Sequence, residues 1–577
     1  MTAMTLDDAV AHVLRTDARF ALGEAVIRGV PLRVFSAAPR SLRDMMVASG
    51  PAHPGADDYL VAGDQRWTYA AFCDEVGRVG RVLTGELGVR RGEPVAIAMR
   101  NHPEILVLMM AVASVGAVAV MLNAWWTREE LEYGLADCAA RVVFADGPRA
   151  ERIAPYAAAR GLTLVGVRDG EAVGQGLASL TAKVGEAAWS EAPIEPDDDF
   201  AVFYSSGSTG RAKGVVLTHR GAISAVWSWL MASAVAPLVA PASAPAAPRR
   251  PSFLVVTPLF HVTASHPLFL LSIPLGAKVV LLAKWDADEA VRLIEREAVT
   301  RFLGVPTQSA DLMEAARRLG ATLPSLESVT AGGAKRPAAQ VAPLAEAFPH
   351  AAVASGWGMT ETNALGIAIG GPEYVARPGV AGRLLPPLQE LRIVDGDGQE
   401  VPHGTLGELT VRSAANMRGY LNQPEATAEA LRDGWLRTGD LATVDADGVV
   451  TIVDRAKSII IRGGENISCL DVEGALHRHP AVVEAGVFPV PDARLGEVVG
   501  AAVQVRDGHA LDATTLTAFL AEHIARYKIP ERLWVASAPL PRGTTDKIDR
   551  RALRTACLDG ALPECPEALP TLAEAAR

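Results

Sequence analysis

The stretch Tyr204-Ser205-Ser206-Gly207-Ser208-Thr209-Gly210-Arg211-Ala212-Lys213-Gly214 lies between two apolar runs, Phe200 to Tyr204 and Val215 to Thr218. The apolar runs predict strands. Glycine allows a positive φ and a close backbone approach, hydroxyls donate hydrogen bonds, and lysine neutralises negative charge. This composition predicts a loop that folds round a polyphosphate. It is not a Walker A loop, because that loop needs a Gly-Lys pair and the chain contains none.

Upstream of this loop, short Val- and Leu-rich runs such as Pro94 to Met99 and Arg141 to Ala145 alternate with helical stretches. This alternation is typical of βα units around a largely parallel sheet. Ile105 to Leu122 is an uncharged apolar run of 18 residues, which is long enough to suggest a membrane span. Ser114 and Gly116 interrupt it, so we predict a buried helix, a turn and a buried strand.

Downstream, residues 235–251 are too rich in proline for a helix or a sheet interior and predict an exposed loop. From about 390 to 455 the pattern changes to short β runs with three hairpin-turn signals, Asp395-Gly396, Asp397-Gly398 and Asp447-Gly448. This segment predicts a β-rich subdomain.

After Lys457 the pattern is compact and mixed. We predict a helix, two strands and a second helix whose apolar residues share one face; these are Leu470 to Arg478, Val482 to Val490, Val498 to Val505, and the helix with Leu516, Phe519, Leu520 and Ile524. The predicted fold class is α/β: a large multi-sheet N-terminal domain over residues 1–456 and a small α+β C-terminal domain over residues 457–577.

The length of 577 residues predicts several folding units. With 49% hydrophobic and 21% charged residues, the chain fits neither a disordered protein, nor a collagen-like fibre, nor a disulfide miniprotein. The net charge of −11 argues against nucleic acid as a partner. It does not exclude ATP, because backbone amides and a few placed cations bind small anions locally.

The five cysteines are scattered and form no CxxC pair, and the N-terminus carries acids where a secretory signal needs bases. We therefore predict a reducing, cytoplasmic location without a transmembrane segment. The spacing of the cysteines and histidines predicts no zinc site, since His261 and His266 lack a third ligand.

Five further motifs follow the first in a fixed order. With it, they make the chain resemble the adenylate-forming enzymes, which comprise acyl-CoA synthetases, luciferases and peptide-synthetase adenylation domains. They are Gly356-Trp357-Gly358-Met359-Thr360-Glu361, Trp435-Leu436-Arg437-Thr438-Gly439-Asp440, Asp454-Arg455-Ala456-Lys457, Arg462-Gly463-Gly464-Glu465-Asn466 and Asp546-Lys547-Ile548-Asp549-Arg550. The resemblance spans nearly the whole chain, and it implies that the C-terminal domain is a mobile lid.

The resemblance implies an ATP site. Thr360 and Thr209 would donate to phosphate oxygens, and Glu361 with Thr209 would hold Mg²⁺. Trp357, where the family usually has Tyr, would stack on adenine, and Asp440, supported by Arg455, would accept from the ribose hydroxyls. The alternatives are a core tryptophan for Trp357 and a turn former for Asp440. The further nucleotide-binding candidates are Ser205, Ser206, Gly207, Ser208, Gly210, Lys213, Gly332, Gly333, Gly356 and Gly358.

In the family, the C-terminal domain serves both half-reactions. Lys547 would contact the carboxylate and the α-phosphate, although Asp546 replaces the glycine that usually precedes this lysine. Lys457 matches the hinge about which the domain rotates. Arg462, Gly463 and Gly464 would then meet coenzyme A, with a simple tight turn as the alternative. The CoA thiol would attack the mixed anhydride, so no catalytic cysteine is needed.

The resemblance places the acid near small or apolar residues: His261, Val262, Ser265, Val305, Pro306, Thr307, Ala331, Gly332, Gly333, Ser355 and Gly356. None is an acid that could receive an α-amino group, which argues against amino-acid activation. The glycines leave room for a long or bulky hydrophobic tail. His261, a catalytic candidate, either gates the tunnel or forms a hydrogen bond in the core.

These observations predict an ATP-dependent acyl-CoA synthetase that converts a hydrophobic carboxylic acid, either a medium- or long-chain fatty acid or a bulky cyclic or aryl acid, to its CoA thioester. The reaction would pass through acyl-AMP with release of pyrophosphate and AMP. One alternative is an acyl-AMP ligase that loads an acyl carrier protein. Another is a homologue that binds nucleotide without catalysis. Luciferase-like oxygenation is not excluded, and dimers occur among relatives, so a homodimer is possible.

Overall fold

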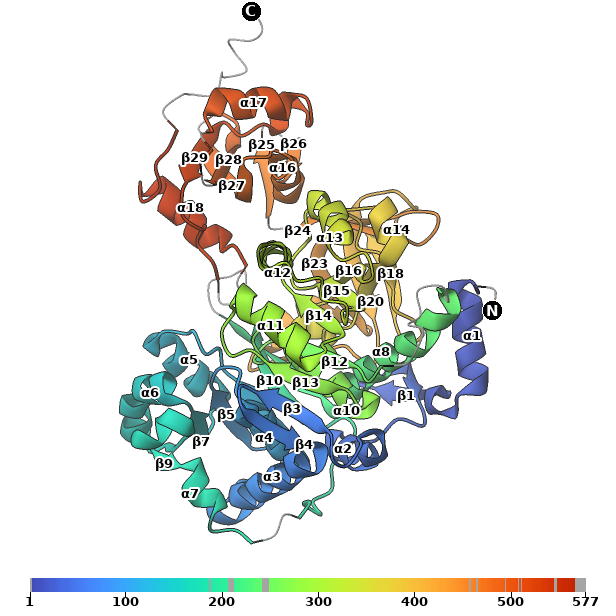
Figure 1. Cartoon of the computed structure of the whole chain (residues 1–577), viewed down its shortest axis with the longest axis vertical. Helices are drawn as coiled ribbons and strands as arrows, with labels where there is room; N and C mark the ends of the chain where they lie inside the picture. Colours follow the sequence, from blue (N-terminus) through green and yellow to red (C-terminus); the bar gives the residue numbers. More distant parts are fainter. Residues whose placement is uncertain are drawn as a thin grey trace, which may run out of the picture.

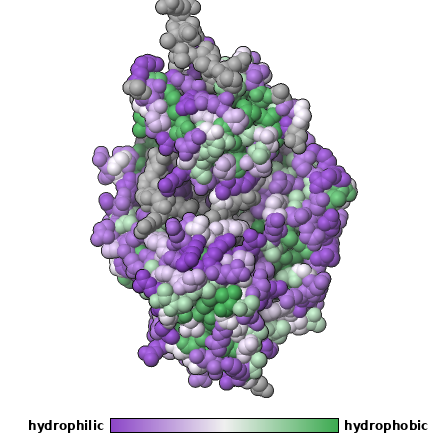
Figure 2. Space-filling view, turned by 90° about the vertical axis from the view of Figure 1, so that its left-hand side faces the viewer, coloured by the Kyte–Doolittle hydropathy of each residue, from purple (hydrophilic) through white to green (hydrophobic). Residues whose placement is uncertain are grey.

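The computed structural model describes residues 3–185, 188–205, 212–240, 249–455, 458–462, 465–492, 494–506, 508–509, 511–543 and 547–565. It has a large body and a smaller C-terminal domain that rests on one end of the body (Figure 1). Hydrophilic residues cover most of the face in Figure 2, with smaller hydrophobic areas between them. This architecture confirms the predicted fold class of a large multi-sheet α/β domain with a small α+β domain.

The first large sheet has eight strands, and its parallel part extends from β10 to β9. β11 returns antiparallel to β10, so the two strands flank the predicted phosphate loop as expected. The predicted strands Pro94 to Met99 and Arg141 to Ala145 correspond to β5 and β7. In order across the sheet, the strands are β21 (Gly419–Tyr420), β11 (Lys213–Thr218), β10 (Asp199–Ser205), β6 (Val118–Met121), β5 (Pro94–Ala98), β7 (Val142–Ala145), β8 (Thr163–Gly166) and β9 (Gln175–Gly176).

The second large sheet has nine strands, parallel from β16 to β3 with antiparallel strands at both edges. Because the carboxyl ends of parallel strands lie at the same edge of a sheet, the loops that follow β14, β15 and β16 lie close together at that edge. In order, the strands are β18 (Arg383–Leu384), β17 (Ile367–Gly370), β16 (Ala352–Trp357), β15 (Ser328–Ala331), β14 (Arg301–Gly304), β12 (Ser252–Val255), β13 (Lys278–Leu281), β3 (Asp58–Ala62) and β4 (Gln65–Thr68).

Helices cover these sheets, and the apolar run from Ile105 to Leu122 folds as predicted. Its first part is the buried helix α4 and its last part is the buried strand β6. The helices of the body are α1 (Leu6–Thr16), α2 (Leu42–Ala48), α3 (Tyr69–Arg81), α4 (Pro103–Ser114), α5 (Arg128–Cys138), α6 (Gly147–Arg160), α7 (Leu177–Thr181), α8 (His219–Val239), α9 (Val262–Ala264), α10 (Leu271–Leu275), α11 (Ala287–Glu297), α12 (Pro306–Leu319), α13 (Val341–Ala347), α14 (Gly371–Ala376) and α15 (Pro424–Ala430).

Helix α8 corrects one prediction. The helix continues to Val239 with Pro237 inside it, so the first five residues of the predicted 235–251 loop are helical. The main-chain amide of Met4, just before α1, donates to the carbonyl of Leu238, and α1 lies beside this end of α8 (Figure 1). Tertiary contacts therefore outweigh the proline signal. Residues 241–248 lie outside the described residues.

By length and composition α8 could cross a membrane, but 56% of its apolar window is buried inside the protein. This burial is what a core helix of the body shows, and a single helix of this kind is weak evidence for a membrane span.

The β-rich subdomain is confirmed as a five-stranded sheet. The Asp447-Gly448 signal forms the turn between β23 and β24, where Gly448 donates to the carbonyl of Asp445. Asp395 likewise holds a turn after β19 by accepting from Asp397 and Gln399. The strands are β19 (Glu390–Val394), β20 (Gly407–Arg412), β22 (Leu431–Arg432), β23 (Trp435–Val444) and β24 (Val450–Arg455), beside a separate N-terminal hairpin of β1 (Leu22–Ile27) and β2 (Val30–Phe35).

The C-terminal domain has its own five-stranded sheet and its own core. Leu516 and Leu520 of α17 are buried in this core, and Phe519 and Ile524 pack against it, as the shared apolar face predicts. The predicted boundary at 456 and 457 falls on residues outside the described ones and stays a prediction. The elements are β25 (Ile459–Arg462), β26 (Glu465–Ser468), α16 (Cys469–Leu476), β27 (Val482–Asp492), β28 (Gly496–Val505), α17 (Ala513–Ala521), β29 (Arg532–Ala536) and α18 (Arg550–Leu558).

Candidate active site

The candidate site lies where the ends of β14, β15 and β16 meet the start of β11, β23 and the C-terminal domain. Of the phosphate-loop candidates, Ser205 ends β10 and Lys213 begins β11, and the two residues are paired across the hairpin. Ser206, Gly207, Ser208, Thr209 and Gly210 lie outside the described residues, so their roles stay predictions. The structure thus places both ends of the predicted loop at this edge.

Glu361, the predicted Mg²⁺ ligand, is buried in a short turn after β16, next to the half-buried Thr360. The hydroxyl of Tyr420 donates to its Oε1 at 3.0 Å. Burial raises the pKa of Glu361 above its usual value, and the hydrogen bond from Tyr420 opposes this shift. A buried carboxylate with only part of its acceptor capacity used is chemically suited to a hard cation.

Trp357 and Asp440 form a direct hydrogen bond, which the sequence did not reveal. The indole Nε1 of Trp357 donates to Oδ2 of Asp440 at 2.8 Å. Asp440 on β23 pairs in register with Arg455 on β24, whose Nε lies 3.0 Å from Oδ1. Burial raises the pKa of Asp440, and Arg455 opposes that shift. Arg455 therefore forms an ion pair with Asp440, and the contacts of Trp357, Asp440 and Arg455 with nucleotide stay predictions.

The glycines around Trp357 differ in what they make room for. A side chain at Gly358 would collide with the carbonyl oxygen of Ala364, only 2.3 Å from the position of an added Cβ. One at Gly366 would collide with the indole ring and with the carbonyl of Trp357. Gly356 faces more open space. Gly366, which the sequence analysis missed, is therefore the residue that lets the Trp357 ring lie against the backbone.

Lys547 comes from the C-terminal domain and reaches the body beside Gly333, at the end of β15. A Cβ added to Gly333, whose φ is +77°, would lie 3.2 Å from Cε and 3.4 Å from Nζ of Lys547. Loss of water and the nearby Arg455 lower the pKa of Lys547 to about 8, although Asp440 opposes the shift. The structure thus brings Gly333, Asp440, Arg455 and Lys547 together, and their roles at the nucleotide stay predictions.

The loop that carries Lys547 is tied both to its own domain and to the body. The amide of Gly543 donates to the carbonyl of Lys547 at 2.7 Å, which closes the loop. Arg542 forms an ion pair with the buried Glu484 of β27, and its Nη1 lies 3.4 Å from Oγ1 of Thr307 at the start of α12. The sequence analysis missed Arg542, because its partners are far away along the chain. Asp546 lies outside the described residues.

On the acid side, Gly332 lies close to Thr263 Cγ2 and Leu303 Cδ2, at 3.6 and 3.8 Å from an added Cβ. His261 packs against Phe260 with ring centroids 4.8 Å apart, and its buried Nε2 has no hydrogen-bond partner among the described residues. Burial and Lys547 lower its pKa to about 3, so the imidazole is neutral at physiological pH. Its predicted role as a gate stays open.

Other predicted pocket residues have structural partners. The hydroxyl of the buried Ser265 donates to the carbonyl of His261 at 3.0 Å. His266 is buried between Ser265 and Asn363, with Nε2 3.0 Å from the Asn363 Oδ1. No group of three or more potential metal-binding side chains occurs in the described part of the chain.

The predicted CoA loop is only partly described. Gly463 and Gly464 lie outside the described residues, as does the hinge residue Lys457. Arg462, with 8% of its side chain exposed, forms an ion pair with Glu531. Its guanidinium is thus already engaged within the C-terminal domain, and a contact with a CoA phosphate stays a prediction.

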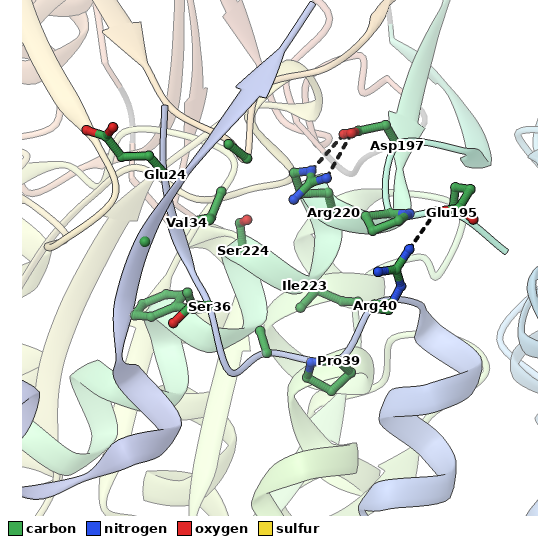
Figure 3. Close-up of a pocket in the computed structure, with 15 residues that line it drawn as sticks. Glu24, Val34, Ser36, Pro39, Arg40, Glu195, Asp197, Arg220, Ile223 and Ser224 are labelled. Atoms are coloured by element: carbon green, nitrogen blue, oxygen red, sulfur yellow. Dashed lines mark hydrogen bonds and ion pairs between the residues drawn. The ribbon is translucent and has the colours of Figure 1, made fainter. Parts of the chain in front are cut away.

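A separate cavity of 420 Å³ opens between the β1–β2 hairpin and α8 (Figure 3). Its two arginines are already neutralised: Arg220 binds Asp197 through two hydrogen bonds, and Arg40 binds Glu195. None of the predicted site residues lines this cavity. We therefore assign it no part in the candidate site.

Two family models match the chain, the AMP-binding enzyme model over residues 47–421 and the AMP-binding enzyme C-terminal domain model over residues 471–547. A feruloyl-CoA synthase from Amycolatopsis is 36% identical over 81% of this chain and 90% of its own. A long-chain-fatty-acid–CoA ligase from Mycobacterium tuberculosis is 31% identical over 85% and 93%. The solved structure of an o-succinylbenzoate CoA synthetase from Bacillus subtilis, bound to its acyl-adenylate, matches with a TM-score of 0.75 and 27% identity over 89% and 98%.

Proposed function

The chain belongs to the AMP-binding enzyme family as an AMP-forming acyl-CoA ligase, and we propose that its substrate is a hydrophobic carboxylic acid, with an aryl acid favoured over a fatty acid. The reaction couples ATP, the acid and CoA through an acyl-AMP intermediate. The observation that supports adenylation at this site is the position of Lys547, which reaches from the C-terminal domain to Gly333 beside Asp440 and Arg455.

The chemistry at this point needs positive charge. When the carboxylate attacks the α-phosphate, negative groups are brought together, and preorganised cations stabilise the transition state. Lys547 and Arg455 supply such charge from opposite domains. Asp440, held by Trp357 and Arg455, would accept from the ribose hydroxyls. The neutral His261 adds no charge and is suited to packing against the acyl group.

Mg²⁺ fits the buried Glu361 carboxylate, which accepts a hydrogen bond from Tyr420 and keeps further acceptor capacity for a hard cation. Glu361 would hold the ion together with Thr209, and phosphate and water oxygens would complete its shell. Bound there, the metal neutralises charge on the triphosphate.

The proposed acid class rests on the composition of the pocket and on the relatives. Phe260 and Trp125 pack edge to face with ring centroids 5.1 Å apart, next to His261. A Cβ added at Gly332 or Gly356 would meet no atom closer than 3.6 Å, so both glycines leave space at the ends of β15 and β16. The similarity to a feruloyl-CoA synthase favours a flat aromatic ring in this space.

A panel of acids tests the proposal: acetate, octanoate, palmitate, benzoate and cinnamate derivatives, and a steroid-like acid, each with ATP, Mg²⁺ and CoA. We expect thioester to form fastest with a substituted cinnamate, and AMP release to require CoA but no carrier protein. Preference for acetate would refute the proposed pocket. Acyl transfer to a carrier protein but not to CoA would support the acyl-AMP ligase alternative.

We propose a cytoplasmic location, which the free state of all five cysteines supports. A homodimer is also proposed, and analytical ultracentrifugation of the purified protein would test it.

A further inference from the structure

Tyr420 lies in β21, at the edge of the eight-stranded sheet next to the predicted phosphate loop. Its backbone is held on both sides: it pairs with Val215 of β11, and its amide donates to Thr427 Oγ1 at 2.9 Å. The next residue, Leu421, donates to the carbonyl of Gly214 at 2.7 Å. The position of the Tyr420 ring is therefore set by the same strand that begins with Lys213.

The hydroxyl of Tyr420 is directed at the predicted metal ligand. It donates to Glu361 Oε1 at 3.0 Å, and the main-chain oxygen of Glu361 accepts from the amide of Met417 at 2.7 Å, in the segment that leads into β21. An ionised carboxylate only accepts hydrogen bonds, so the phenol must be the donor. Two contacts, one from the side chain and one from the main chain, thus fix Glu361 against this segment.

The ring of Tyr420 faces the phosphate-loop lysine. The ammonium of Lys213 lies 4.7 Å from the ring centroid, which is within the range of a cation–π contact. One side chain therefore contacts both a predicted phosphate cation through its ring and a predicted Mg²⁺ carboxylate through its hydroxyl.

We propose that Tyr420 is a positioning residue that fixes Lys213 and Glu361 relative to each other, so that the phosphate cation and the metal carboxylate are set before ATP binds. The inference rests on the proposed function, because it takes Lys213 and Glu361 to be the phosphate and metal groups of the ATP site. The two contacts are separable: the hydroxyl acts on the metal ligand and the ring acts on the lysine.

Two variants of the full-length chain separate these contacts. Tyr420→Phe removes the hydroxyl and keeps the ring, whereas Tyr420→Leu removes both. ATP binding is measured by titration calorimetry, once with Mg²⁺ and once with EDTA. For Tyr420→Phe we expect affinity for Mg²⁺–ATP to fall about tenfold, the loss typical of a hydrogen bond to a charged group, with metal-free ATP affected less than about twofold. For Tyr420→Leu we expect both affinities to fall.

Tyr69→Phe is the matched control, because it removes a hydroxyl that donates to the carbonyl of Met46 in the buried core, away from the site. It should bind ATP as the unmodified chain does in both conditions. Thermal unfolding of each variant reports whether the fold is intact.

Equal affinities for Tyr420→Phe and the unmodified chain would overturn the inference, and so would an equal loss with and without Mg²⁺ in a folded Tyr420→Phe. If the unmodified chain binds ATP but none of the acid panel yields a thioester, the proposed function fails while the role of Tyr420 can still be judged from binding. If it binds no ATP, both proposals fail.

Discussion

The body and the C-terminal domain hold their charged site residues in different ways. In the body, Asp440 has direct partners in Trp357 and Arg455, and Glu361 has Tyr420. Lys547 of the C-terminal domain makes no hydrogen bond or ion pair through its ammonium with any residue that the structure describes. The body groups are fixed by contacts within the body, whereas Lys547 is held by the placement of its loop alone.

This difference has an energetic basis. A desolvated ammonium without a partner is unfavourable, which is why the pKa of Lys547 falls to about 8. Anionic substrates would relieve this cost by supplying the missing partner. We therefore expect the body groups to be fixed before nucleotide binds, and the ammonium of Lys547 to gain its partner from anionic substrates.

Lys547→Ala should have the largest effect. It tests the C-terminal domain, whose charged site residue has no direct partner among the described residues. We expect acid-dependent ATP–pyrophosphate exchange to fall about 100- to 1,000-fold, as when one preorganised transition-state donor is lost. Thioester formation from preformed acyl-AMP and CoA should change far less. Lys528→Ala, which removes a half-buried lysine paired with Asp471 in the same domain, is the control. A near-normal exchange rate would refute the role of Lys547.

Asp440→Asn tests the body, where the charged site residues have direct partners. The amide keeps the shape of the carboxylate but loses its charge and one acceptor, so Arg455 and the indole of Trp357 lose their common partner. We expect KM for ATP to rise about 10- to 100-fold, from the loss of charge-assisted hydrogen bonds. Asp445→Asn, in the turn after β23, is the control. An unchanged KM for ATP would show that Asp440 is structural.

The pH dependence should show the low pKa of Lys547. Exchange activity should decrease above about pH 8, where the free enzyme loses this charge, and Lys547→Arg should keep a flat profile at a reduced rate because arginine stays protonated. The pKa is lower folded than unfolded, so between about pH 8 and 10.5 the unfolded chain binds more protons and this group favours folding increasingly as pH rises. A flat activity profile for the unmodified chain would contradict the assignment.

Thr307→Val should have the smallest effect. It removes the oxygen that lies 3.4 Å from Arg542 Nη1 and so loosens the contact between α12 and the loop of Lys547. Since a bond this long is weak, we expect a decrease of about two- to threefold in exchange activity. Thioester formation from acyl-AMP is measured in parallel, and an equal decrease in both steps would argue against a role in domain placement.

Much of the fold could be predicted from the sequence, because its signals are local. Alternating apolar runs predicted the parallel strands β5 and β7, and the Asp447-Gly448 pair predicted the β23–β24 turn. The ordered motifs identified Lys547, Asp440 and Arg455 as site candidates, and the structure brings these three residues together. Proline was misleading only in α8, where packing against α1 outweighs its low helix propensity.

The residues that the sequence did not reveal contact partners that lie outside their own motif. Tyr420 reaches Glu361 because β21 returns to pair with β11. Arg542 reaches Thr307 because the two domains meet. Gly366 matters through its packing against Trp357, a neighbour across the β16–β17 hairpin. No local pattern marks these positions, since each depends on the register or on the domain arrangement.

A side chain at Gly333 would meet Lys547 directly. A methyl group there would lie 3.2 Å from Lys547 Cε, on a residue whose φ of +77° already disfavours a side chain. Gly333→Ala should therefore push Lys547 away from the body. The population of molecules in the domain arrangement seen here should decrease. We expect such a variant to enrich the other domain arrangement that the family resemblance implies, without replacing any charged group of the site.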